Sequence, residues 1–288
     1  MRNVRRTVLR KAQCLVLAIM LFFAMGLNAT VLHKVTVKCP ICGEENTFYG
    51  FAGWGGYLYS YPSKFQMVFF PHTYPTSLWT CKKCHYTAWI GDFEALPAEK
   101  IEAARNALKE AALPEFTNYE RVPMADRLAV AERIYRELGK DDLFWSYFYQ
   151  VKGFHLGACS QAEMAKQSRL KAAGVLKRLV ADPKYTEERK PLLLALAAMR
   201  HYLGDEQAAL ETLAMAASEP DPPSARKNTD KFLDNFHDKL IAEYREAIKS
   251  RSVPTDEQSV NLLPGIMGNE TIDLAGPERI WAVRACGK

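Results

Sequence analysis

Apolar residues recur at helical spacing from Pro97 onward. They return every three or four positions, in stretches that end at a proline or a glycine. This period places the apolar side chains on one face of a helix. The pattern predicts successive helices at residues 97–113, 124–139, 141–154, 161–180, 187–203, 206–217 and 230–249.

The predicted helices have similar lengths and short connections, which is typical of a repeat of helical hairpins. The clearest copy starts at Leu193 and ends at Pro220. It carries Gly204 before its second helix and small alanines where two helices would cross closely, and so resembles the tetratricopeptide pattern. A weaker copy runs over residues 129–183. The sequence therefore predicts an all-α, tetratricopeptide-like domain over residues 96–251.

The preceding segment, residues 30–95, follows a different pattern. Residues 31–38 and 86–89 are each expected to form a short strand. Residues 48–79 contain twelve aromatic side chains, which glycines and prolines interrupt, so a long helix is excluded there. We interpret these aromatic rings as the core of a small module, with an exposed aromatic binding surface as the alternative.

Two Cys-x-x-Cys pairs enclose most of this aromatic segment. Cys39 and Cys42 form the first pair, Cys81 and Cys84 form the second, and 38 residues separate them. Each pair can form a tight knuckle that directs two thiolates at one ion, and two knuckles complete a tetrahedral site. The spacing predicts a structural Zn²⁺ site in a zinc-ribbon-like β module. Disulfides or reduced structural thiols are the plainer alternative.

The second cysteine pair has another interpretation, because His85 follows it. Cys81-x-x-Cys84-His85 is also the attachment motif of c-type haem. Haem would leave Cys39 and Cys42 without a purpose, so zinc is favoured and haem c is kept as the alternative.

Two further cysteines, Cys159 and Cys286, are expected to be unpaired bystanders. A disulfide between them is the alternative in an oxidising compartment.

The N-terminus has the pattern of an export signal. A basic start is followed by an apolar run from Cys14 to Leu27, which is short for a membrane span and suited to the core of a signal peptide. We expect residues 1–29 to direct the chain to the periplasm or another extracytoplasmic location. They are either cleaved after Ala29 or retained as an anchor, which would be the only contact with a membrane.

Charge excludes one class of partner. The net charge of the 288 residues is +5, but five of the 38 basic residues and no acidic residue precede Ala29. The rest of the chain holds 33 basic and 33 acidic residues, so it has no overall positive field for nucleic acid. Residues 252–288, rich in glycine and proline, are expected to form an irregular tail.

No familiar catalytic constellation is found in the sequence. A glycine-rich phosphate loop, His-Glu-x-x-His and Gly-x-Ser-x-Gly are all absent. His72, His155, His201 and His237 are scattered, and each is interpreted as a packed or surface histidine. A group of polar residues on the last helix is interpreted as a solvated face: Lys231, Asp234, Asn235, His237 and Asp238.

The order of these parts resembles a bacterial family catalogued as domain of unknown function 2225. The resemblance spans about residues 38–250 and implies a pair of zinc knuckles joined to tetratricopeptide-like helices. It implies no reaction, because the family has no established one. His85 stands where the family has glycine, and the export signal is a second departure. The motifs that carry the resemblance are both knuckles, Tyr74-Pro75, Leu78-Trp79, Asp92-Phe93, residues 133–139 and residues 238–245.

Together these observations predict an exported, non-catalytic, zinc-binding protein of the interaction or scaffold type. Its helical repeat is expected to hold a protein or peptide partner, since such repeats build extended concave surfaces. Two alternatives stay open. One is a c-type haem electron-transfer protein that uses Cys81, Cys84 and His85, and the other is an enzyme with an unrecognised site.

Overall fold

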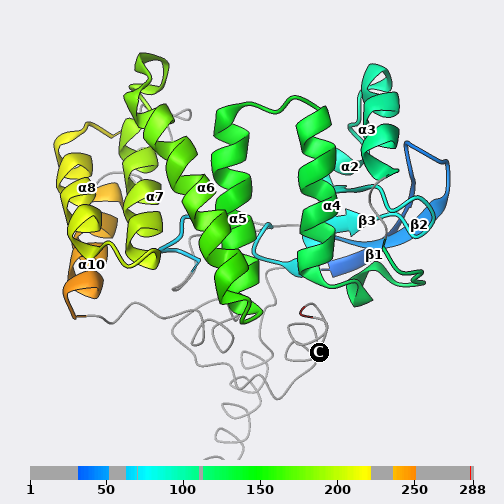
Figure 1. Cartoon of the computed structure of the whole chain (residues 1–288), viewed down its shortest axis with the longest axis horizontal. Coiled ribbons are helices and arrows are strands. Elements are labelled where there is room, and N and C mark those ends of the chain that lie inside the picture. Colours follow the sequence, from blue (N-terminus) through cyan, green and yellow to red (C-terminus); the bar gives the residue numbers. More distant parts are fainter. Residues whose placement is uncertain are drawn as a thin grey trace, which may run out of the picture.

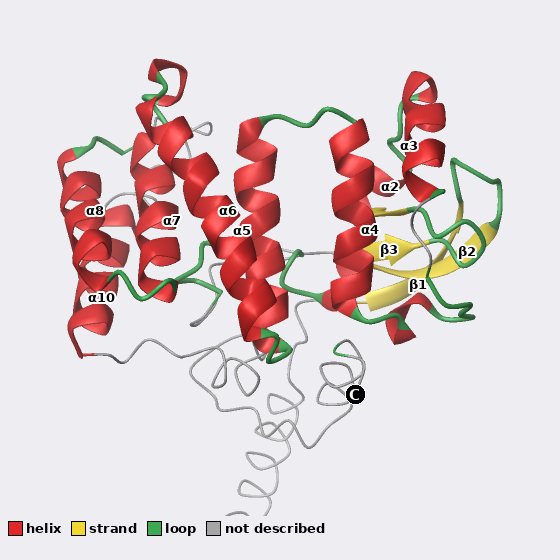
Figure 2. Cartoon of the chain, in the orientation of Figure 1, coloured by secondary structure: helices red, strands yellow, loops and turns green. Residues whose placement is uncertain are grey.

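The computed structural model describes residues 32–51, 63–69, 71–109, 113–221, 236–250 and Cys286. Within these residues, a small β region stands at one end of a row of helices (Figure 1). Among the described residues, strands occur only at that end (Figure 2). The predicted export signal at residues 1–29 lies outside the described residues, as does the predicted tail apart from Cys286.

Two antiparallel hairpins form the β region. Strand β1 (Leu32–Lys38) pairs with β2 (Glu45–Phe51), and β3 (Leu78–Thr80) pairs with β4 (Thr87–Trp89). The strands expected near β1 and β4 are confirmed, whereas β2 was not predicted. Burial alternates along β2, where Asn46, Phe48 and Gly50 are buried, but apolar and polar residue types do not alternate in its sequence.

The helices follow the predicted order with small shifts at their ends. They are α2 (Ile90–Phe93), α3 (Ile101–Leu108), α4 (Met124–Glu137), α5 (Asp142–Ala158), α6 (Ala162–Ala181), α7 (Arg189–Tyr202), α8 (Glu206–Ser218) and α10 (Phe236–Ser250). Only the one-turn helix α2 was not predicted. Short 3-10 turns occur at Pro75–Ser77, Ala98–Lys100, Tyr119–Arg121 and Pro183–Tyr185.

Local capping chemistry sets several of these helix ends. The Asp141 side chain accepts a hydrogen bond from the backbone of Phe144 at 2.9 Å and so satisfies a free N–H at the start of α5. Asp205 does the same for Ala208 at the start of α8, at 3.2 Å. Helices α4 and α7 are each followed by a glycine with positive φ, Gly139 at 67° and Gly204 at 83°.

Consecutive helices pack side by side. Helix α5 packs on α6, α6 on α7, α7 on α8 and α8 on α10, while α4 joins α5 to the β region (Figure 1). We call α4 to α8 together with α10 the helical array. Leucine and alanine side chains fill much of its core. The helical character is therefore confirmed, but the tetratricopeptide-like repeat is not.

The chain between the two cysteine pairs leaves the β region and crosses the array. We call residues 63–77 the crossing segment, of which 70 is not described; Figure 1 shows it in cyan among α5 to α7. The ring of Phe65 is fully buried, with its centroid 5.8 Å from that of Tyr202 and 4.4 Å from that of Tyr244. The sequence suggested that the aromatic segment forms one local core, and the structure shows that it does not. Part of it packs on α7 and α10.

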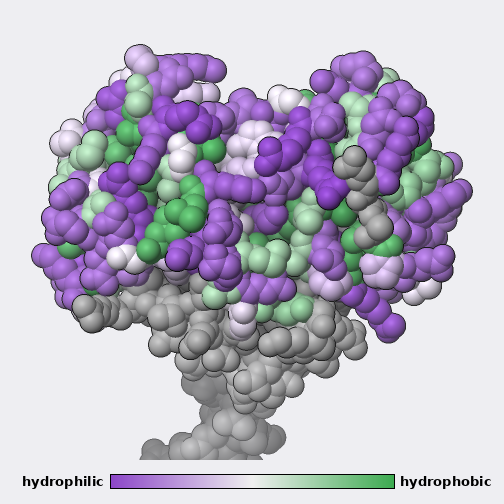
Figure 3. Space-filling view, in the orientation of Figure 1, coloured by the Kyte–Doolittle hydropathy of each residue, from purple (hydrophilic) through white to green (hydrophobic). Residues whose placement is uncertain are grey.

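The visible face of the molecule is mainly hydrophilic, and its apolar side chains form separate small groups (Figure 3). None of the helices within the described residues is long and apolar enough to cross a membrane.

Candidate metal centre

The first cysteine pair lies in the turn between β1 and β2. The backbone N–H of Gly43 donates to the carbonyl of Cys39 at 2.9 Å, and the N–H of Cys39 donates to the carbonyl of Glu44 at 2.9 Å. Gly43 has a φ of 73°, which glycine adopts without steric cost. This closed turn holds Cys39 and Cys42 on the same side of the hairpin end.

The second pair repeats the same turn between β3 and β4. The N–H of His85 donates to the carbonyl of Cys81 at 3.0 Å, and the N–H of Cys81 donates to the carbonyl of Tyr86 at 2.8 Å. His85 therefore occupies the place of Gly43, and its φ is 63°. Its ring stacks on Phe116, with centroids 5.5 Å apart. A positive φ is easy for glycine and costly for a residue with a Cβ atom, so glycine would fit at this place and a histidine is unusual there.

The four sulfurs of the two knuckles come together. All four lie within 4.8 Å of one another, with Cys39 Sγ 3.5 Å from Cys84 Sγ and Cys42 Sγ 3.7 Å from Cys81 Sγ. Sulfurs around a tetrahedral zinc ion are about 3.8 Å apart, given Zn–S bonds of about 2.3 Å. The cluster could therefore hold one metal ion. His85 is not part of the group, and no other such group occurs among the described residues.

The electrostatics of the cluster favour a cation. Cys39 and Cys81 are buried, and Cys42 and Cys84 are half-buried. Hydrogen bonds from the Cys39 and Cys84 thiols lower the pKa of Cys81 far below its ordinary value. The hydrogen bond with Cys81 raises the pKa of Cys39 to about 12, and that with Cys39 raises the pKa of Cys84. Further thiolates in this space need a positive charge between them.

Asn46 connects the two knuckles from β2. Its buried side chain donates to the carbonyl of Glu44 at 2.9 Å and to Cys81 Sγ at 3.5 Å. Its Oδ1 accepts the backbone N–H of Lys82 at 2.9 Å. A hydrogen bond to a ligand sulfur orients it and stabilises its thiolate. The sequence analysis missed Asn46, because β2 was not predicted and its residue types do not alternate in a way that marks Asn46 as inward.

Arg127 on α4 fixes the strand that carries the second knuckle. Its guanidinium is almost fully buried and donates to the carbonyls of Pro75 at 2.8 Å, Leu78 at 2.9 Å and Val122 at 3.1 Å. Burial lowers its pKa to about 10, so it still carries its charge at neutral pH. The end of the crossing segment and the start of β3 are thus attached to the helical array.

Tyr135, in the last turn of α4, makes a second attachment. Its hydroxyl accepts the backbone N–H of Trp89 at 2.9 Å and donates to Asp92 Oδ2 at 2.7 Å. Because Trp89 ends β4 and Asp92 lies in α2, this contact positions the exit from the second knuckle.

Aromatic packing forms the small core beside the cysteines. The Phe48 ring stacks on Trp79 with centroids 4.6 Å apart, and Phe93 and Tyr119 meet Phe48 edge-on at 5.0 and 5.1 Å. The prediction of an aromatic core is confirmed for Phe48 and Trp79, which belong to the aromatic segment.

The histidines that look scattered in the sequence are partly brought together. His155 Nε2 lies 2.6 Å from the carbonyl of His72, so the crossing segment meets α5 there. Burial lowers the pKa of both imidazoles to about 4. His201 packs edge-on against Phe65, with ring centroids 5.3 Å apart. His237 lies far along the array, 2.8 Å from Asp221.

The polar group expected on the last helix is described only from Phe236 onward; Lys231, Asp234 and Asn235 lie outside the described residues. Asp238 pairs with the buried Lys190 of α7 at 2.8 Å. Part of the group therefore joins α10 to α7 and is not simply a solvated face.

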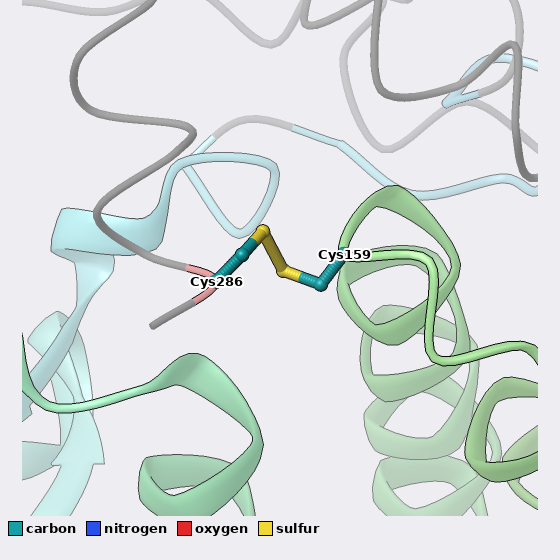
Figure 4. Close-up of a disulfide and its surroundings, with 2 residues drawn as sticks. All are labelled: Cys159 and Cys286. Carbon is teal, nitrogen blue, oxygen red and sulfur yellow. A yellow bond between two sulfur atoms is a disulfide. The ribbon is translucent and has the colours of Figure 1, made fainter. Parts of the chain in front are cut away.

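Cys159 and Cys286 form a disulfide (Figure 4). Their Cα atoms are 5.1 Å apart and the bond spans 127 residues of sequence. The expectation of two unpaired thiols was therefore wrong, and the alternative is the one observed. The error arose because sequence separation gives no indication that Cys286 returns to the end of α5.

Neither the curated proteins nor the solved structures gave a match to this chain. A family comparison did. Residues 32–132, from β1 into α4, match the family described as an uncharacterized protein conserved in bacteria, DUF2225. The resemblance predicted from the cysteine and aromatic motifs is thereby confirmed over these residues, which include all four clustered cysteines.

Proposed function

We propose that this chain is an exported zinc protein without catalytic activity, in which one structural ion locks the β region and the helical array binds a protein partner. The observation that carries the zinc assignment is the cluster of four cysteine sulfurs, all within 4.8 Å of one another.

The donor set supports zinc over the alternatives. Four thiolates in a tetrahedral arrangement suit zinc, and they leave no open position for a substrate. Haem attachment would use Cys81 and Cys84 in thioether bonds and His85 as an iron ligand. The approach of Cys39 Sγ to 3.5 Å from Cys84 Sγ supports a shared ion instead.

The ion would close a loop that reaches across the molecule. The crossing segment begins after β2 and ends at β3, so each of its ends leads to one knuckle. Between them, Phe65 is buried against α7 and α10, and His72 is bonded to α5. Joining the knuckles with zinc would therefore fix both ends of a strap that lies on the array. We infer that the metal organises this junction, which is a structural role.

The disulfide supports the proposed location. Disulfides persist in extracytoplasmic compartments, and Cys159 and Cys286 form a disulfide. The four clustered thiols are nevertheless unpaired, at sulfur distances of 3.5 and 3.7 Å. A bound metal ion would protect them from oxidation in the same compartment.

A partner would bind the part of the array that the crossing segment leaves uncovered. Apolar side chains are exposed on three helices: Leu143 on α5, Met164 and Leu170 on α6, and Met215 on α8. The balanced charge of the chain after Ala29 favours a protein over nucleic acid. Affinity capture with the full chain, in wild-type form and with Leu170 and Met215 changed to serine, tests this role. A defined partner that only the wild type retains is expected, and salt-sensitive binding of nucleic acid would contradict it.

Metal analysis combined with a visible spectrum tests the central assignment. The purified protein is expected to contain one zinc ion per chain, to lack a Soret band and to have two cysteines in a disulfide. A Soret band would establish the haem alternative. Metal-free protein with Cys39, Cys42, Cys81 and Cys84 oxidised would refute both cofactors.

Export is tested separately with a fusion of residues 1–40 to a reporter that is active only outside the cytoplasm. An active reporter is expected, and replacing the apolar run at residues 14–27 with a polar sequence should silence it. A silent wild-type fusion would contradict export without affecting the metal assignment.

A further inference from the structure

A small aromatic pocket lies where the second hairpin meets α5. Its volume is about 240 Å³, and its walls include Trp89, Phe144, Tyr147 and Phe148, together with His72 and Asp92. A water molecule occupies about 30 Å³ of liquid, so the pocket has room for roughly eight non-hydrogen atoms. Junctions between structural units are common places for ligand sites. The four cysteines are not among its lining residues.

An ammonium group of the chain itself lies against two residues of the pocket wall, Asp92 and Phe144. Lys140 Nζ lies 5.0 Å from the ring centroid of Phe144 and 5.4 Å from that of Tyr135. It is also 3.6 Å from Asp92 Oδ1. Aromatic faces and a carboxylate together stabilise a cation. The contacts of Lys140 with Asp92 and Phe144 indicate that this part of the pocket wall can stabilise a cation.

His72 adds a neutral polar group to the same pocket. The Tyr147 hydroxyl accepts the N–H of Phe69 at 3.2 Å and lies 3.2 Å from His72 Nδ1. Burial lowers the pKa of His72 to about 4. The histidine consequently brings no positive charge against a cation at neutral pH.

We propose that this pocket binds a small organic ammonium ion with a flat apolar body. The ammonium group pairs with Asp92 in place of Lys140, and the body lies among Trp89, Phe144 and Phe148. Anions are excluded by the Asp92 carboxylate, and neutral analogues lose the charge interaction. This site is independent of the zinc assignment.

Three probes of nearly equal shape test the charge preference. The full zinc-loaded chain is titrated with benzylamine, benzyl alcohol and benzoate, and binding is followed by calorimetry and by ligand-observed nuclear magnetic resonance. Benzylamine is expected to bind about tenfold more tightly than benzyl alcohol, and benzoate is expected not to bind. Equal affinity for the amine and the alcohol, preference for benzoate, or no binding of benzylamine would overturn the proposal.

Two substitutions test the residues. Asp92→Asn should weaken benzylamine about tenfold and leave benzyl alcohol unchanged, whereas Glu137→Gln, an exposed carboxylate at the end of α4, should change neither. Lys140→Gln should strengthen benzylamine, because the internal competitor is removed. An unchanged or weaker affinity in Lys140→Gln would contradict the role of Lys140. This variant also decides the case if Asp92→Asn does not fold, since Lys140 is only partly buried.

Discussion

The two ends of this molecule are held together by different means. The β region, which we call the cysteine module, has strands of seven and three residues, and its four cysteines gather at the hairpin ends. The helical array instead buries a continuous set of leucine and alanine side chains across α5 to α8. Short strands with a small core are marginal by themselves, whereas packed helices are not. We therefore expect the module to depend on the proposed ion and on its attachments to α4, and the array to depend on apolar burial.

Removing one sulfur should break the module and spare the array. Cys39→Ser leaves an incomplete coordination sphere, and metal binding in comparable sites contributes apparent energies of about 10–16 kcal/mol to folding. We expect loss of zinc and rapid hydrogen exchange in β1 to β4, with far-ultraviolet circular dichroism of the helices retained. Lys38→Ser is the matched control, because its side chain is 75% exposed. Loss of helical signal together with the zinc would show that the two regions form one cooperative unit.

The reverse experiment creates a cavity in the core of the array. Leu194 in α7 is fully buried, so Leu194→Ala should cost about 2–5 kcal/mol. The measurement is chemical unfolding followed by circular dichroism, with zinc content determined in parallel. Zinc should stay at one per chain while the midpoint of helix unfolding falls. Leu170→Ala makes the same change at a side chain that is 46% exposed, and it should shift the midpoint little.

Arg127 is where the two regions are joined. Arg127→Met keeps an unbranched apolar side chain but removes the guanidinium, so the buried carbonyls of Pro75 and Leu78 lose their donor, at a cost of about 1–3 kcal/mol for each unsatisfied group. Hydrogen exchange should rise in β3 and around the crossing segment, more than in α6 to α8. Arg121→Met, at an exposed position in the 3-10 turn just before α4, is the control. Equal effects of the two variants would refute the attachment.

The sequence predicted the helices and the cysteine pairs but not the contacts that join the two regions, and the difference has a physical reason. Helix period and glycines such as Gly204 are local signals, and so is the spacing of Cys39 and Cys42. Arg127 has the helical position of a core residue but a charged side chain, and two of its three carbonyl partners, Pro75 and Leu78, lie about 50 residues earlier. Nothing local could indicate them.

The same limit applies to the crossing segment and the pocket. Phe65 looks like part of a local aromatic core, yet its ring partners Tyr202 and Tyr244 come from helices far along the chain. His72 lies in the crossing segment and Asp92 in α2, and the two line one pocket only in the folded chain. Spacing can predict a site whose ligands lie in two short motifs, but not one that tertiary packing assembles.

Acid should weaken the array through one buried carboxylate. Glu132 on α4 pairs with Lys152 at 2.6 Å, Arg136 at 2.8 Å and Lys171 at 3.1 Å. Burial would raise its pKa, but these cations outweigh that effect and lower the pKa from 4.5 to about 2. Its stabilisation is therefore complete above about pH 4.5 and is lost as the pH falls through 2.

Glu132→Gln measures this contribution. At neutral pH the variant should be less stable than the wild type by about 2–3 kcal/mol, and the difference should disappear toward pH 2. Circular dichroism of the helices gives the free energy of unfolding at each pH, and Glu137→Gln is the exposed control. A difference that does not change with pH would mean that Glu132 acts by packing and not by its charge.

The smallest effect is expected at the turn that distinguishes the two knuckles. Gly43 and His85 occupy equivalent places with φ of 73° and 63°, and a residue with a Cβ atom pays about 1–2 kcal/mol for that conformation. His85→Gly removes this cost but also removes the ring that stacks on Phe116. The free energy of unfolding should therefore change by no more than about 1 kcal/mol, and the zinc content should not change. Gly43→Ala makes the opposite change in the first knuckle. Nothing lies within 4 Å of the added Cβ, so backbone strain alone should lower the free energy of unfolding by about 1 kcal/mol. Zinc release under competition with a chelator reports both changes. Loss of the cofactor in His85→Gly would instead make the histidine a ligand, as the haem alternative requires.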